Sequence, residues 1–223
     1  MILEVLSTFV DAARISAGIR AVMELAVHTY QWLRQLWGER RISPESLVQA
    51  PMSEEDLEMC EKTGQTIREI FGDDVYERVE DASYSERIAL AEEMVQKLTE
   101  VYGLELEPCR LFVDSNETNC GGYEIKERRI NLNIAAMFSE DEAQVYELLD
   151  TIVHELRHAV QWEAVRTADF WNMDGETRDR WRENFMNYVS PGQDINGYIH
   201  QPVEEDARTF AYHSMKGVRK DEE

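Results

Sequence analysis

Residues 150–161 read DTIVHELRHAVQ, and at their centre lies the pattern H-E-x-x-H, formed by His154, Glu155 and His158. On an α-helix, residues four positions apart lie on the same face, so both imidazoles can reach one metal ion. Glu155 lies beside them, close enough to act on a water molecule that such an ion binds. Two neutral imidazoles and a neighbouring carboxylate are the groups that a zinc-activated water requires. The pattern therefore predicts a metal centre on a helix.

The sequence around the motif predicts that helix. Ser139 is followed by three acidic residues, an N-cap signal whose charges suit the positive end of the helix dipole. From there to about residue 165 the sequence contains no glycine or proline. Apolar residues recur on the side opposite the motif: Val145, Leu148, Leu149, Ile152, Leu156, Ala159 and Val160. We expect this side to face a core and the histidines to face a polar groove, where Asp150 or Gln161 can orient an imidazole.

A metal ion held by two histidines needs at least one more protein ligand. Residues 198–211, YIHQPVEEDARTFA, place acidic side chains just after Pro202, a residue that suits the first turn of a helix. On a helical wheel Glu204 lies at the edge of the apolar face, whereas Glu205 points to solvent. We therefore expect Glu204 to be the third metal ligand. Asp206 lies at the other edge of that face, where a hydrogen bond or a salt bridge is expected.

The combination of His154, Glu155 and His158 with a downstream helical Glu204 resembles the zincin metallopeptidases in their gluzincin-like form. Residues 104–211 resemble the small bacterial and phage-type domains of this class. In those domains a short sheet precedes the H-E-x-x-H helix, and a later helix carries Pro-x-Glu-x-Asp-Ala, here residues 202–207. The resemblance implies a zinc metallopeptidase, a hydrolase in which His154, His158 and Glu204 bind one Zn²⁺ ion. Glu155 is then the general base that activates water against a peptide bond.

The sequence differs from related zincin patterns at three points, which exclude one branch of the class and leave two alternatives open. Gln161 and Ala164 stand where the metzincin pattern needs Gly and His, so that branch is excluded. Arg208 stands where the longer gluzincin pattern has an aspartate. In SprT-like proteases the third ligand is a histidine, which here would be His200 or His213. Two alternatives therefore remain, a SprT-like protease and a catalytically inactive zincin-fold protein that binds metal and mediates an interaction.

The charge of the chain bears on its partners. The 223 residues carry a formal net charge of −22, with a pI near 4.6. Nucleic acids and anionic membranes attract basic proteins, so the composition argues against both as partners. We expect a peptide or protein substrate, and long-range attraction would favour a basic one. An acidic binding module that mimics nucleic acid is the alternative that the charge suggests.

The cysteines and the N-terminal residues indicate the cellular compartment of the protein. Cys60, Cys109 and Cys120 are odd in number and widely spaced, so they predict no disulfide framework and fit a reducing compartment. Residues 1–5, MILEV, lack the basic start of a signal peptide, and no run of about 18 apolar residues predicts a membrane span. We expect a cytoplasmic protein.

The pattern along the chain predicts an α+β fold that is mostly helical. Helices are expected over residues 2–38, from Ser53 to about residue 70 with Gly72 at the end, and from about Ser83 to residue 102, stopped by Gly103. These form a helical N-terminal region, residues 1–103, that packs on the core of a zincin-like metallopeptidase domain, residues 104–223. The boundary lies where the helical periodicity ends.

A small antiparallel or mixed sheet is expected just before the motif helix. Residues 104–113 alternate and contain Pro108, which predicts a strand that lies partly at an edge. Residues 123–126 and 129–133 alternate on either side of a two-residue turn, which predicts a hairpin. In a peptidase such a sheet can hold an extended peptide by strand addition.

Aromatic residues lie between the motif helix and Glu204. Trp181, Phe185 and Tyr188 have helical spacing, which is more typical of core packing than of a substrate platform. Tyr198 and His200 lie closer to Glu204 in the sequence, and either can donate a hydrogen bond to an oxyanion.

Overall fold

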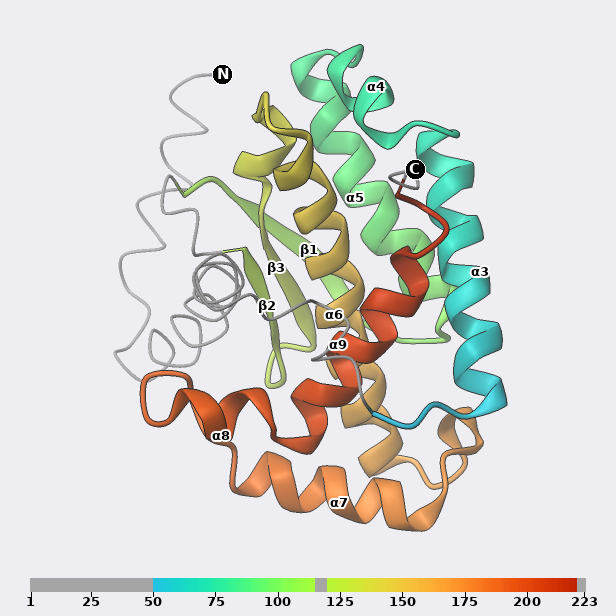
Figure 1. Cartoon of the computed structure of the whole chain (residues 1–223), viewed down its shortest axis with the longest axis vertical. Coiled ribbons are helices and arrows are strands. Elements are labelled where there is room, and N and C mark those ends of the chain that lie inside the picture. The colour runs from blue at the N-terminus through green and yellow to red at the C-terminus, as the bar shows by residue number, and fades with distance from the viewer. Residues whose placement is uncertain (1–49, 115–119, 220–223) are drawn as a thin grey trace.

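The computed structural model describes residues 50–114 and 120–219 as a mostly helical α+β fold with one three-stranded sheet (Figure 1). In chain order the elements are α3 (Glu54–Phe71), α4 (Val75–Glu80), α5 (Tyr84–Val101), β1 (Glu107–Phe112), β2 (Gly121–Glu124), β3 (Arg129–Asn133), the 3₁₀-helix η3 (Ile134–Phe138), α6 (Glu142–Arg166), the 3₁₀-helix η4 (Phe170–Asn172), α7 (Gly175–Met186), α8 (Ile195–Ile199) and α9 (Pro202–Met215). The predicted helix over residues 2–38 lies outside the described residues. Within those ranges, no helix combines the length and apolarity that crossing a membrane requires.

The predicted helices of residues 50–103 begin and end where their capping residues indicate. Ser53 forms a capping box with Asp56 at the start of α3, and Gly72 ends that helix with a φ of 81°, which favours glycine. Ser83 caps α5 in the same way. The short helix α4, which begins after its N-cap Asp74, was not expected from the sequence.

The start of the motif helix differs from the prediction by two residues. Helix α6 is capped by Asp141, whose side chain accepts a hydrogen bond from the backbone N–H of Ala143. Ser139 instead ends η3, a 3₁₀-helix that follows directly on β3. The shift arises because the apolar residues 134–138 form a turn of their own against the core and delay the start of α6.

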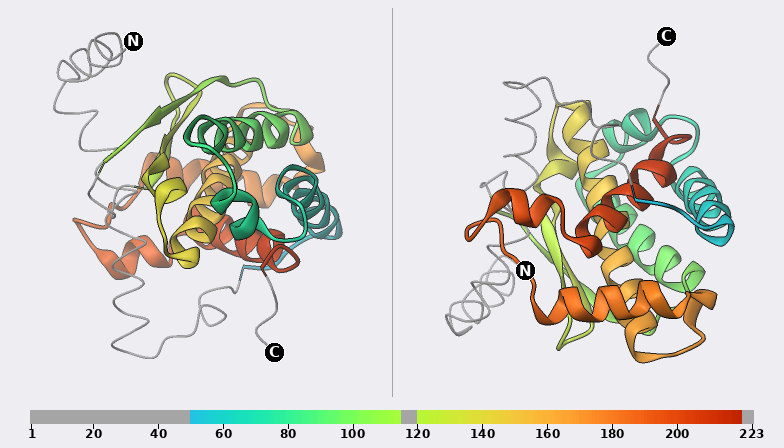
Figure 2. Two further views of the ribbon diagram at one scale, coloured as in Figure 1. Left: turned by 90° about the horizontal axis from the view of Figure 1, so that it is seen from above. Right: turned by 60° about the horizontal axis from the view of Figure 1, so that its bottom comes forward.

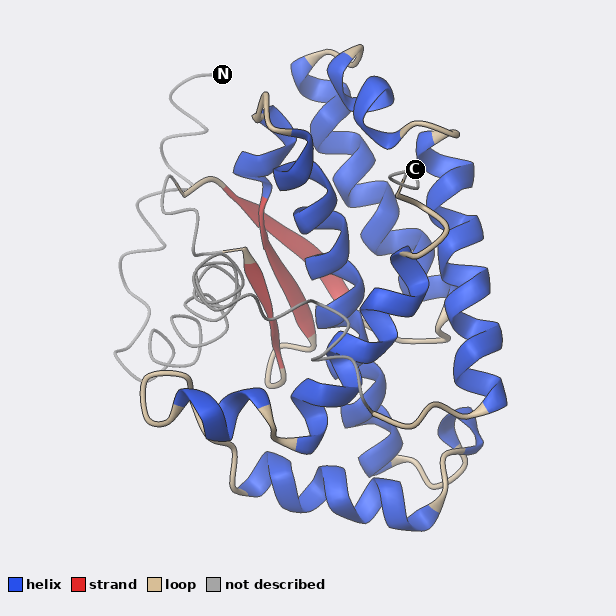
Figure 3. Cartoon of the chain, in the orientation of Figure 1, coloured by secondary structure: helices blue, strands red, loops and turns tan. Residues whose placement is uncertain are grey.

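The sheet has the strand order β1-β3-β2, with β1 parallel and β2 antiparallel to β3. The predicted hairpin of β2 and β3 and the edge position of β1 are both confirmed. Pro108 lies where the register between β1 and β3 shifts, between residues 107 and 110, which is a position that tolerates a missing N–H. Figure 3 shows the sheet beside α6, with α9 and α3 on the other side of that helix, so α6 is central to the fold.

One core joins the N-terminal helices to the motif helix. The apolar side of α6 packs in a single buried cluster with residues of α3, α5, β3 and α9, among them Ile67, Leu98, Leu132 and Phe210. The described helices before residue 104 therefore pack on this core. Gly64 allows α3 to approach α9 closely, because a Cβ atom there would lie 2.9 Å from the carbonyl oxygen of Ser214. The two further views in Figure 2 show α3 alongside α9 and α7 at the opposite end of the molecule from α4.

Candidate metal centre

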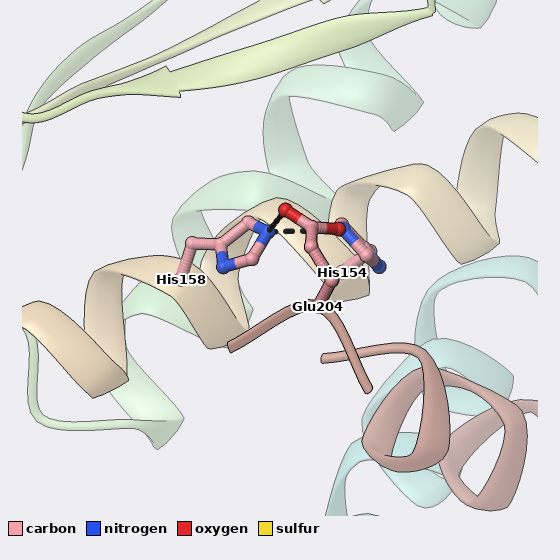
Figure 4. A group of neighbouring side chains, drawn as sticks. All are labelled: His154, His158 and Glu204. Carbon is pink, nitrogen blue, oxygen red and sulfur yellow. Dashed lines mark hydrogen bonds and ion pairs between the residues drawn. The ribbon is translucent and has the colours of Figure 1, made fainter. Parts of the chain in front are cut away.

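Helices α6 and α9 bring His154, His158 and Glu204 together (Figure 4). One ligand atom from each of the three residues lies within 4.8 Å of the other two. Nε2 of His154 is 3.3 Å from Oε2 of Glu204, and Nε2 of His158 is 3.2 Å from Oε1. Helix α9 begins at Pro202, as the sequence predicts, so Glu204 lies in its first turn and is 1% exposed. All three predicted ligands therefore share one site.

The competing ligands lie elsewhere. Glu205 points away from the cluster and pairs at the surface with Nδ1 of His200, 3.2 Å from its Oε1 atom. His213 lies in the last turn of α9. Among residues 50–114 and 120–219, the only group of three or more metal-binding side chains consists of the two motif histidines and Glu204. Neither His200 nor His213 belongs to it, so this part of the chain lacks the histidine ligand of a SprT-like arrangement.

Gln161 leaves the metal-facing nitrogen of His158 available. The Nε2 group of Gln161 donates to the carbonyl oxygen of Val203 at 2.8 Å and to Oδ2 of Asp206 at 2.6 Å. Its Oε1 atom therefore faces Nδ1 of His158, 2.8 Å away, and accepts that atom's proton. The proton on Nδ1 leaves the Nε2 lone pair free to bind a metal. Two imidazoles and one carboxylate form a donor set that suits zinc, so these residues fit the ion that the motif implies.

Without a metal ion the cluster is a buried charged pair. Burial lowers the pKa of His158, but the adjacent Glu204 carboxylate outweighs this and raises the pKa to about 9. For Glu204 burial has the opposite effect and raises the pKa. His158 and His154 lower it by more, so the pKa of Glu204 lies well below its usual range. A metal ion would have to displace a proton from His158.

Two tyrosines hold the Glu204 carboxylate. The hydroxyl group of Tyr188 donates to Oε1 and that of Tyr198 donates to Oε2, both at 2.7 Å. Burial and the charge of Glu204 raise the pKa of Tyr188 well above its usual value, which keeps its hydroxyl group protonated. Tyr188 packs against the apolar cluster of Trp181, as expected, and because it lies beyond the end of α7 at Met186 its hydroxyl group also reaches the site. Trp181 is buried, as expected.

The side chain of Glu155 extends from the motif helix to the edge of the sheet. Its Oε2 atom accepts a hydrogen bond of 2.8 Å from the backbone N–H of Tyr123, and the residue is 6% exposed. The carbonyl oxygen of Cys120 accepts a hydrogen bond from the backbone N–H of Asn133 in β3. In an antiparallel pair every second residue bonds to the partner strand, so Gly121 and Tyr123 point their backbone N–H and C=O groups away from β3. In the described part of the chain β2 is thus an edge strand whose outer side faces Glu155.

Arg157 is the residue that the sequence reading missed. It lies between the motif histidines, no role was predicted for it, and it is 1% exposed. Its guanidinium group binds Asp206 through Nε and Nη2, at 2.7 and 2.9 Å, and Asp56 through Nη1, at 2.7 Å. The ion pair that was expected for Asp206 is therefore confirmed. On a helical wheel Arg157 lies next to the apolar stripe, and that position was the available signal.

Comparison of the chain with protein-family models, with curated proteins and with solved structures finds no match. The likeness to zincins is thus carried by the motif residues alone. The interpretation of the site depends on its own geometry, in which His154, Glu155, His158 and Glu204 meet beside a sheet edge.

Proposed function

We propose that the chain is a zinc-dependent metallopeptidase that hydrolyses bonds in a peptide or protein substrate. One observation carries the proposal. His154, His158 and Glu204 offer ligand atoms within 4.8 Å of one another, and the adjacent Glu155 carboxylate lies at a sheet edge. The ligands, the general base and a surface for an extended chain therefore lie in one place.

The three ligands supply what one zinc ion needs. A zinc ion held by His154, His158 and Glu204 would lower the pKa of a bound water molecule and polarise a carbonyl oxygen. His158 offers Nε2 because Gln161 keeps the proton on Nδ1, 2.8 Å away. Glu204 offers a carboxylate that two tyrosines orient. These contacts support a site whose ligands are already oriented.

Glu155 acts as the general base in this proposal. Its carboxylate takes a proton from the attacking water and passes a proton to the leaving amine. The hydrogen bond from the backbone of Tyr123 anchors the carboxylate beside β2. An extended peptide that pairs with the outward backbone groups of Gly121 and with the carbonyl oxygen of Tyr123, whose N–H already donates to Glu155, would lie next to this carboxylate.

A tyrosine can stabilise the negative charge that develops on the carbonyl oxygen. Both Tyr188 and Tyr198 place a hydroxyl group 2.7 Å from Glu204. Tyr198 is 3% exposed, whereas Tyr188 is half-buried. Tyr188 is therefore the better placed hydrogen-bond donor for an oxyanion.

A metal-binding interaction protein without turnover is the second candidate, and Arg208 favours it. The Nη1 atom of Arg208 lies 3.8 Å from Oε2 of Glu204, where the longer gluzincin pattern has an aspartate. A positive charge at this distance opposes a divalent ion. This candidate predicts bound zinc without hydrolysis of any peptide.

The experiment combines metal analysis with hydrolysis of a diverse peptide library, read by mass spectrometry. Glu155→Gln should keep one zinc ion per chain and lose hydrolysis by at least about a hundredfold, since general acid–base catalysis contributes that much. Glu163→Gln is the matched control, because Glu163 lies on the same helix and pairs with Arg128 instead. Unchanged turnover in Glu155→Gln would contradict the catalytic assignment, and zinc without turnover in the wild type would favour the second candidate.

A further inference from the structure

A continuous set of buried and partly buried hydrogen bonds runs from α3 to His158. Asp56 accepts from Nη1 of Arg157 at 2.7 Å, and Arg157 donates twice to Asp206. Asp206 in turn accepts from Nε2 of Gln161 at 2.6 Å. Gln161 completes the set through its Oε1 atom, 2.8 Å from Nδ1 of His158. Three helices, α3, α6 and α9, therefore meet in one hydrogen-bonded network that ends at a candidate metal ligand.

The surroundings of this network keep its partners fixed. Arg157 is 1% exposed and Gln161 is fully buried. The guanidinium carbon of Arg157 lies 4.6–5.5 Å from the ring centres of three aromatic residues, Trp171, Trp181 and Phe210. The Asp206 side chain is 14% exposed, but Arg157 and Gln161 are shielded from water. A hydrogen bond that Arg157 or Gln161 loses is not replaced by water, so these two residues hold their partners in one orientation.

Asp206 selects the orientation of the Gln161 amide. With Asp206 and the carbonyl oxygen of Val203 both accepting, the amide must turn its NH₂ group towards them and its oxygen towards His158. Without the Asp206 carboxylate, the Gln161 amide loses one of the two acceptors that fix its orientation. Arg157 holds Asp206 through a planar, two-point ion pair, and Asp56 fixes the third donor of the same guanidinium group.

We propose that Asp206, Arg157 and Asp56 are positioning residues that act through Gln161 to orient the imidazole of His158 for metal binding. The proposal rests on the proposed function only in taking His158 as a metal ligand. It assigns a role in the site to α3, which precedes the region that resembles zincins. Helix α3 is then a functional part of the metal centre as well as a packing element.

The first test observes the Nδ1 proton of His158 by NMR in the metal-free, full-length protein. A proton held by Gln161 should give a slowly exchanging signal, assigned by its loss in His158→Gln. Asp206→Asn and Gln161→Leu should abolish or broaden that signal. Glu205→Gln, which removes the same charge from the neighbouring residue of α9, should leave it unchanged. A wild-type-like signal in Asp206→Asn would overturn the proposal.

The second test measures zinc affinity by competition with a chelator. Asp206→Asn should weaken zinc binding by about 10–100-fold, the usual effect of losing a partner of a metal ligand. In the Gln161→Leu background the same substitution, and likewise Asp56→Asn, should cause no further loss. Additive losses would show that Asp206 acts by another route and would overturn the proposal.

A control separates positioning from general destabilisation. Trp181→Phe removes packing against Arg157 but none of the network's hydrogen bonds, so it should lower the unfolding midpoint and leave zinc affinity unchanged. Weaker zinc binding in Trp181→Phe, equal to that of Asp206→Asn, would count against the proposal. If the wild type binds no zinc, the proposed function fails, and the Nδ1 signal still decides whether the network orients His158.

Discussion

The Nε2 atoms of His154 and His158 lie 3.0 Å apart, and both face the carboxylate of Glu204. Two packed helices produce this arrangement, because α6 supplies both imidazoles and the first turn of α9 supplies the carboxylate.

The choice of third ligand can be tested with neighbouring residues. Glu204→Ala should lower zinc affinity at least about a hundredfold, because it removes one of three protein ligands. Glu205→Ala should keep wild-type affinity, because Glu205 pairs with His200 at the surface. His154→Ala should also lose the metal. Elemental analysis checks all three, and full zinc occupancy in Glu204→Ala would refute the ligand assignment.

Zinc affinity should rise with pH between about 7 and 9. Because the pKa of His158 in the metal-free protein is raised to about 9, this residue carries a proton at pH 7 that the metal must displace. We expect about a tenfold gain in affinity from pH 7 to pH 8 and the release of about one proton per zinc ion. Calorimetry in two buffers of different ionisation enthalpy counts the protons. Uptake of zinc without proton release would contradict this prediction.

The stability of the metal-free protein should fall as pH rises towards 9, whereas zinc affinity rises. The raised pKa of His158 means that its pairing with Glu204 contributes fully below its ordinary pKa of 6.5 and is lost as pH rises through about 9. The lowered pKa of Glu204 keeps this contribution present above that residue's ordinary pKa of 4.5. The pair should therefore stabilise the metal-free fold most between pH 4.5 and 6.5. Denaturant unfolding of the wild type and of His158→Gln measures the difference, and equal pH profiles would contradict the prediction.

Arg157 should matter greatly for stability. Arg157→Met leaves Asp56 buried and Asp206 partly buried without their counter-charge, which should cost about 3–5 kcal/mol in the free energy of unfolding. Arg128→Met is the control, because its partly exposed pair with Glu163 should contribute at most about 1 kcal/mol. Equal losses in the two variants, measured by denaturant titration, would count against a special role for the buried arginine.

Tyr188 should affect turnover more than metal binding. Tyr188→Phe removes one hydrogen-bond donor and should lower kcat by about 10²-fold if that donor stabilises the oxyanion. Tyr198→Phe should lower kcat less, because Tyr198 is buried against Glu204. Steady-state kinetics of zinc-loaded variants on one cleaved peptide gives the comparison. A larger loss in Tyr198→Phe would reverse the assignment.

Local patterns in the sequence were sufficient for much of the fold. Ser53, Gly72 and Ser83 mark helix ends through contacts with residues a few positions away, so their effect is visible without a structure. The hairpin of β2 and β3 is predictable for the same reason. Helix α4 and the delayed start of α6 were missed because the packing of apolar residues against the core decides them.

For the site, the sequence by itself determined that His154 and His158 share a helix face, with Glu155 beside them, because the α-helix repeats every 3.6 residues. The helical wheel also placed Glu204 at the edge of a packed face. Only the tertiary structure decided that Arg157 is buried, that Tyr188 reaches Glu204, and that Gln161 orients His158 with Asp206 and Asp56 behind it. These contacts join residues up to 101 positions apart, and only the packing of α3, α6 and α9 around one core brings them within hydrogen-bonding distance.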